Sequence, residues 1–209
     1  MLHTETVSFG TLELLKSLMQ DERMAQFVLV GGTSLSLQLG HRISVDLFLF
    51  SATPFDEGEL SSYLASNYGL ELDFISRCTI KGEIKGVQID CIAHQYPWIE
   101  PFLEKNGIRL ANIVDIAAMK LNAIAGNGTR IKDFIDIAYL SSYLSFEEML
   151  HAYEQKYKAN PVNPLKAITY WDDINFSEPI RMLDASTFRW QKIEKRLREM
   201  QRFPDKRIL

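Results

Sequence analysis

The chain contains 209 residues, 46% of them hydrophobic and 24% charged, and carries a net charge of −4. This composition is ordinary for a globular protein, the length allows one domain or two small ones, and no apolar run reaches the roughly 20 residues that a membrane helix needs. The N-terminus does not have the pattern of a signal peptide, and Cys78 and Cys91 have no metal-type spacing, so we expect a cytoplasmic protein with reduced thiols and no membrane association.

Two elements are predicted before the first glycines of interest. Residues 11–21 have leucine and methionine side chains at near-helical spacing, which predicts an amphipathic helix. The four apolar residues at 27–30 are long enough for a short buried strand. We expect the helix to pack on the sheet that contains this strand.

A pair of glycines follows the strand. Gly31 and Gly32 precede Thr33, where a short helix could begin with the threonine hydroxyl as its N-cap, and Gly40 would end that helix. Paired glycines let a phosphate approach the backbone closely, because no Cβ stands in the way. The N-terminus of a helix also favours an anion. The segment therefore predicts a phosphate-binding turn.

A second strand is expected at about residues 45–50. Because strand side chains alternate between faces, Asp46 and Phe48 should share one face, whereas Val45 should point into the core. A metal site on such a strand would need a second carboxylate two residues after the first. This chain has Phe48 at that position, which limits any prediction of enzymatic activity.

Arg42 lies in the turn before this strand, next to His41. One interpretation is a polar loop in which Arg42 pairs with a nearby acid. The other is contact between Arg42 and a phosphate of a bound nucleotide. The residues alone do not decide between them.

A helix is expected at 55–67 and strands at 70–77, 79–84 and 87–93. The last strand, VQIDCIA, contains Asp90 as a lone acid among apolar residues. Burying an unpaired carboxylate is costly, so Asp90 lies either on a solvated edge or in an active site near Asp46. A short final strand is expected at 108–110.

Beyond about residue 110 the patterns are helical. Helices are expected at 112–125, 129–143, 145–158 and 163–170, and a final helix would begin at Ser186 or Thr187 and end before Pro204. We therefore predict an α+β fold, with a mixed β-sheet and flanking helices in residues 1–110 and a helical part in residues 111–209.

Several charged residues lie on these predicted helices. Lys120 falls on or beside an apolar face, where a lysine can extend along the packed surface and keep its ammonium in water. Lys132 and Asp136 are four residues apart, which allows a surface ion pair. Asp115 is in a first helical turn and could offset the helix dipole.

The strings GGTSLSLQLGHR and SVDL, taken together, resemble the AbiEii/AbiGii toxin-like nucleotidyltransferases. The first motif of that family is apolar-Gly-Gly/Ser, a spacer and Asp-x-Asp/Glu. It corresponds here to Val30-Gly31-Gly32 and Asp46-Leu47-Phe48, and the second acid is missing. The string RIKDFIDI resembles the family's last motif, and the resemblance covers nearly the whole chain.

This resemblance implies a nucleotidyltransferase-like fold that transfers a nucleotide from an NTP to an acceptor with Mg²⁺, and a C-terminal part that completes the site. Two Mg²⁺ ions suit such chemistry when about three carboxylates hold them. The residues implied are Gly31, Gly32, Thr33, Arg42 and Lys120 for the nucleotide, Asp46 and Asp90 for the metal, and Asp46, Asp90, Lys120, Lys132, Asp133 and Asp136 for catalysis.

Three functions are compatible with these residues. The first is a toxin-like enzyme that transfers a nucleotide to an RNA acceptor such as tRNA and has an antitoxin protein as partner. The second is a degenerate member that binds a nucleotide or an antitoxin without turnover, as the loss of the acid at Phe48 suggests. The third is a small-molecule nucleotidyltransferase.

Residues 189–209 are basic, with eight Lys/Arg and three Asp/Glu, whereas the rest of the chain is acidic. Such an end could bind RNA. The alternative is a solvated helix face that has no nucleic-acid partner.

Overall fold

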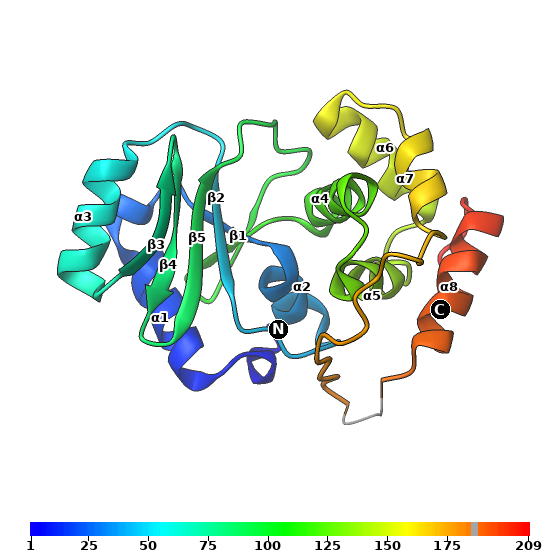
Figure 1. Cartoon of the computed structure of the whole chain (residues 1–209), viewed down its shortest axis with the longest axis horizontal. Coiled ribbons are helices and arrows are strands. Elements are labelled where there is room, and N and C mark those ends of the chain that lie inside the picture. The colour runs from blue at the N-terminus through cyan, green and yellow to red at the C-terminus, as the bar shows by residue number, and fades with distance from the viewer. Residues whose placement is uncertain (185–187) are drawn as a thin grey trace. The chain divides into compact units, whose positions relative to one another are not determined.

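The chain forms two units, one with a β-sheet and one built of helices (Figure 1). The computed structural model describes residues 1–184 and 188–209. The first unit comprises Met1–Pro97 and Pro101–Ala111, and the second comprises Trp98–Glu100 and Asn112–Leu209. None of the described helices is both long and apolar enough to cross a membrane.

The first unit contains a seven-stranded mixed sheet with the strand order β3-β4-β5-β2-β1-β7-β6. The β2–β5 and β1–β7 pairs are parallel, and the other neighbours are antiparallel. The strands are β1 Val28–Val30, β2 Leu47–Ser51, β3 Glu71–Ser76, β4 Thr79–Ile84, β5 Val87–Ala93, β6 Leu103–Lys105 and β7 Ile108–Leu110. The helices are η1 Thr4–Thr6, α1 Phe9–Gln20, η2 Glu22–Met24, α2 Gly31–Leu39 and α3 Glu57–Tyr68. This arrangement confirms the predicted mixed sheet with flanking helices.

The core of this unit lies between one face of the sheet and helices α1 and α3 (Figure 1). Its buried side chains include Leu15, Leu18, Leu47, Leu49, Leu64 and Ile89. Because β2 alternates, Phe48 and Phe50 lie on the opposite face and are half-buried. Burial raises the pKa of the Cys91 thiol on the core side of β5 to about 12, and the charge of neighbouring Asp90 contributes less.

Two local predictions about this unit are wrong. Val45 is 55% exposed and not in the core, because β2 begins at Leu47 and the alternation does not extend back to it. Thr33 is not an N-cap, because α2 already begins at Gly31 and lacks a side-chain cap. Gly31 has a φ of +68°, which turns the chain directly from β1 into the helix.

Strand β6 was not predicted. It forms a hairpin with β7 through Asn106 and Gly107, whose φ angles of 54° and 74° match a type I′ turn. The Asn-Gly pair is the signal that could have revealed this hairpin. The residues of β6 themselves, Leu-Glu-Lys, show too little apolar alternation to indicate a strand.

The second unit consists of α4 Ile113–Gly126, α5 Ile131–Leu140, α6 Phe146–Tyr157, α7 Val162–Ala167 and α8 Trp190–Arg202. A capping box is present at the start of α6, where the Ser145 hydroxyl accepts the Glu148 N–H and the Glu148 carboxylate accepts the Ser145 N–H. The predicted start of the last helix, Ser186 or Thr187, lies outside the described residues. An isolated parallel β-bridge joins Arg130 and Asn175 in this unit.

Candidate functional site

The glycine turn between β1 and α2 holds a buried cation. A Cβ added to Gly32 would lie 2.2 Å from Nη2 of Arg42, so the guanidinium occupies the space that a side chain would need. Arg42 is 3% exposed, and its Nη1 donates a hydrogen bond to the Ile43 carbonyl at 3.2 Å. Gly32 therefore allows a full positive charge to lie against the first turn of α2. That turn already has N–H groups without partners inside the helix.

Thr33 connects this turn to the first candidate carboxylate. Its side chain is buried, with Oγ1 2.8 Å from Ser44 Oγ and donating to the Asp46 carbonyl oxygen at 2.5 Å. These bonds fix the backbone that leads into β2. Thr33 thus positions Asp46, whose own side chain is half-buried.

Five residues form a row across the non-core face of the sheet. The strand registers pair Val30 with Phe48, Phe48 with Asp90, Asp90 with Lys81 and Lys81 with Phe74. We call this set the Phe48 row. It begins next to the glycine turn, since a Cβ on Gly31 would lie 3.5 Å from Cδ2 of Phe48.

Asp90 in this row has a cation as partner. Its Oδ2 lies 3.0 Å from Nζ of Lys81, and the Asp90 side chain is 14% exposed, whereas that of Lys81 is 44% exposed. Asp90 is therefore an ion-paired residue within the sheet and not a solvated edge acid. Lys81 was not predicted as a site residue. Its place opposite Asp90 depends on the β4–β5 register, which the sequence left undefined.

The donor set does not fit two Mg²⁺ ions. Two ions about 4 Å apart require carboxylate oxygens that bridge or surround them. Here Phe48 provides no oxygen and Asp90 is paired with Lys81. Across residues 1–184 and 188–209, no three His, Cys, Asp or Glu side chains are grouped so that they could hold a metal.

The second unit brings three other predicted residues together. Lys120 Nζ of α4 lies 2.6 Å from Asp133 Oδ1 and 2.7 Å from Asp136 Oδ2, both on α5. All three are buried, and Asp136 is fully buried. Lys120 therefore does not extend to water but joins α4 to α5 through ion pairs with two aspartates.

Lys132 has a different partner from the one predicted. Its Nζ lies 2.7 Å from Glu178 Oε1, and Asp136 belongs to the Lys120 cluster, so the expected Lys132–Asp136 surface pair is wrong. The four-residue spacing was compatible with that pair. The interpretation failed because Asp136 lies on the buried face of α5, where it pairs with Lys120 of α4.

A second buried ion pair was missed. Lys156 of α6 and Asp115 of α4 are 2.7 Å apart and both side chains are completely buried. Asp115 also accepts the N–H groups of Ile99 and Glu100 at 3.1 Å, and the Lys156 ammonium lies 4.8 Å from the centre of the Trp98 ring. Asp115 thus anchors residues 98–100 and is not merely a dipole partner. The spacing of Lys156 from the apolar residues of α6 could have placed it on the buried face.

The basic C-terminal segment is partly structural. Arg196 donates to Ser141 Oγ at 2.8 Å and also to Ser142 Oγ and the Ile208 carbonyl, and burial lowers the pKa of its guanidinium. Arg198 pairs with Glu194 and lies over the Trp171 ring. Not all of these cations are therefore available to a nucleic acid.

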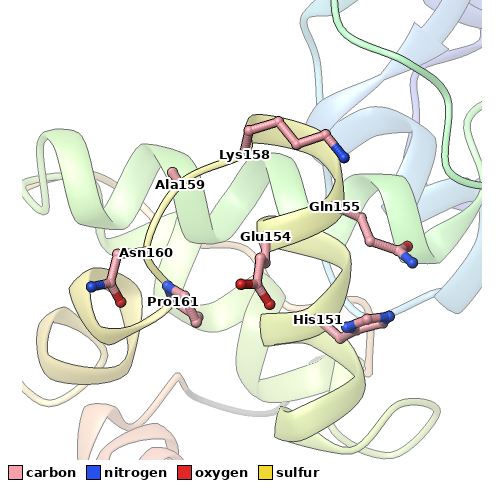
Figure 2. A pocket seen from close by; sticks show the side chains of 7 residues that line it. All are labelled: His151, Glu154, Gln155, Lys158, Ala159, Asn160 and Pro161. Carbon is pink, nitrogen blue, oxygen red and sulfur yellow. The ribbon is translucent and has the colours of Figure 1, made fainter.

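A separate pocket of about 680 Å³ lies at the end of α6 (Figure 2). It is lined by His151, Glu154, Gln155, Lys158, Ala159, Asn160 and Pro161. None of the predicted site residues contributes to it, so the pocket gives them no support.

The fold is similar to that of two solved structures. A candidate nucleotidyltransferase from H. pylori has a TM-score of 0.55 at 16% identity, with 94% of this chain and 95% of that chain covered. The JHP933 protein from Helicobacter pylori has a TM-score of 0.53 at 16% identity, with 94% and 92% covered. The chain therefore shares the fold of these two structures.

The family follows from the sequence comparison. Residues 13–84 and 66–206 match the family described as "Nucleotidyl transferase AbiEii toxin, Type IV TA system". The chain belongs to this AbiEii nucleotidyltransferase toxin family. An uncharacterised protein of Aquifex aeolicus (strain VF5), aq_aa25, is 30% identical over 154 residues, which are 70% of this chain and 74% of that protein.

Proposed function

We propose that this protein binds a nucleoside triphosphate at the Gly31–Gly32 turn. The observation that carries the proposal is the Arg42 guanidinium packed against Gly32 at the first turn of α2. Both glycines are half-buried, and the N–H groups of a first helical turn are suited to donate to a phosphate. A buried guanidinium beside this turn adds a full charge to the helix dipole, and both attract the triphosphate.

The reaction we propose is transfer of a nucleotide from the NTP to an acceptor. An acceptor oxygen would attack the α-phosphate, its proton would leave to a base or water, and pyrophosphate would be expelled. Mg²⁺ would arrive as the counter-ion of the NTP, because the chain's own donors do not fit two ions. We expect the natural protein to transfer weakly, since Phe48 stands where the family has an acid.

The partners in this proposal follow from family membership. An RNA acceptor, tRNA among the candidates, and an antitoxin protein are the expected macromolecular partners. The cytoplasm, where NTPs and RNA are both present, is the proposed location. The participation of Lys120, Lys132, Asp133 and Asp136 in the chemistry stays a prediction.

A second candidate function is nucleotide binding without turnover. It is favoured by two residues of the Phe48 row, the phenylalanine itself and Asp90 in its ion pair with Lys81. Both candidates require NTP binding, so binding is tested first.

Isothermal titration of the full chain with ATP, GTP, CTP and UTP, each with Mg²⁺, tests the proposal. At least one NTP should bind. Arg42→Met, which removes the charge and leaves Gly32 unhindered, should weaken binding by on the order of tenfold. Arg77→Met, at an exposed arginine of the same unit, is the matched control and should bind as the natural chain does. Absence of binding with all four NTPs, in protein that melts cooperatively, would refute the proposal.

A further inference from the structure

We infer that Lys81 takes the place of a divalent ion at Asp90, so that NTP binding by this protein does not require a metal. The inference rests on the proposed NTP binding and concerns the cation that neutralises the Asp90 carboxylate. The residues of the Phe48 row differ from what the chemistry of the nucleotidyltransferase family requires. The family's chemistry uses carboxylates to hold cations, and here one such carboxylate already has a cation from the chain itself.

The geometry of the pair is fixed by the sheet. Asp90 and Lys81 are directly opposite each other in the antiparallel β4–β5 register, and their charged atoms are 3.0 Å apart. The Asp90 side chain is largely buried, so water screens the pair less than it would a surface pair. A divalent ion would have to displace the ammonium before it could use this carboxylate.

The position next to Asp90 does not supply the second carboxylate that a metal site would need. Phe48 is the register partner of Asp90 on β2, about 5 Å away across the sheet. An acid there would add a negative charge and oxygens beside Asp90, whereas the phenyl ring adds neither. Mg²⁺ is strongly hydrated and is held in proteins by several oxygen ligands, so one paired carboxylate is a poor site.

The first unit supplies cations of its own. Arg42 packs against Gly32, and Lys81 pairs with Asp90. A triphosphate brings several negative charges and would meet cations that are already present. The Lys81 ammonium is 44% exposed, so it can bond a phosphate oxygen while it remains beside Asp90.

The test compares NTP binding by the full chain in buffer with Mg²⁺ and in buffer with excess EDTA. The natural protein should show affinities that differ by less than about threefold between the two buffers. Lys81→Gln should lose on the order of tenfold in EDTA, as expected for one charge-assisted contact, and should regain part of it with Mg²⁺. Lys81→Arg should keep metal-independent binding. Lys105→Gln, at an exposed lysine on β6, is the control and should behave as the natural chain does.

Mn²⁺ binding without nucleotide, followed by electron paramagnetic resonance, gives an independent readout. Little Mn²⁺ should bind to the natural protein. Binding should appear in Phe48→Asp but not in Phe48→Asn, because asparagine has nearly the shape of aspartate without its charge. Binding of NTP only when Mg²⁺ is present would overturn the inference and leave the proposed function standing. An unchanged affinity of Lys81→Gln in EDTA would overturn the role of Lys81. Absence of NTP binding in both buffers would refute the proposed function and the inference together.

Discussion

Gly32 has no side chain, and the Arg42 guanidinium occupies the space that one would fill, with Nη2 2.2 Å from the position of an added Cβ. The sequence presented Gly32 as a residue that opens the backbone to a phosphate. In the folded chain it also makes room for a buried arginine. The contact between Gly32 and Arg42 depends on the tertiary fold, so no local sequence pattern could have indicated it.

This contact predicts a compensating pair of substitutions. Gly32→Ala should destabilise the protein by about 1–3 kcal/mol, because the added methyl group overpacks against the guanidinium. Arg42→Ala in the same chain should remove most of that added cost, so the two changes should be strongly non-additive. Urea unfolding of both single variants and of the double variant measures the coupling.

Gly10→Ala provides the control for this experiment, because an added Cβ on α1 meets only Ser8 Oγ, at 3.9 Å. This change should be neutral or stabilise by up to about 1 kcal/mol, since alanine favours a helix. Additive effects at Gly32 and Arg42 would contradict the contact.

At the scale of elements, hydrophobic alternation predicted much of the sheet. Strands β4 and β5 have the bounds that were predicted. The start of α2 was less accurate, because Gly31 permits an abrupt turn that helix-cap rules do not describe. The bounds of β2 were also less accurate, because this strand begins only at Leu47. Short β6 was missed because three residues carry no periodicity.

The candidate site was predicted less completely than these elements. The sequence singled out Asp90, Lys120, Asp133 and Asp136, but it could not show their partners. Ion pairs such as Lys81–Asp90 depend on strand register, and the Lys120 cluster depends on how α4 packs with α5. Lys156 escaped notice because a lysine at an interior helix position is ordinarily assumed to reach solvent.

The Asp115–Lys156 pair joins α4 to α6 and should be important for the stability of the second unit. Lys156→Met should destabilise by about 3–5 kcal/mol, because it leaves the fully buried Asp115 without its cation. Thermal unfolding should show a clearly lowered melting temperature. Adding Asp115→Asn should not add a second loss of the same size, because the uncompensated charge is then gone.

Lys195→Met is the matched control, because Lys195 is 79% exposed and 4.0 Å from Glu199 on α8. Its effect on stability should lie within about 0.5 kcal/mol. Equal effects of the Lys156 and Lys195 substitutions would show that the buried pair contributes no more than a surface pair.

At the scale of the whole molecule, the chain is an AbiEii family member with an altered set of charged residues. The glycine turn and Asp46 are present, whereas Phe48 and the Lys81–Asp90 pair depart from a two-metal arrangement. The family assignment was accessible from sequence motifs. The position of Phe48 between the glycine turn and Asp90 explains why the residues do not fit a two-metal site. Only the strand registers give this position.

The most direct measurement of the central claim is nucleotide transfer itself, with labelled NTPs, Mg²⁺ and total tRNA, in the natural chain and in Phe48→Asp. The account predicts bound NTP but little labelled RNA for the natural protein. It predicts an increase of on the order of tenfold or more for Phe48→Asp, abolished by adding Asp46→Ala. Robust transfer by the natural protein that Asp46→Ala abolishes and Phe48→Asp does not improve would contradict the account and show that another residue completes the site.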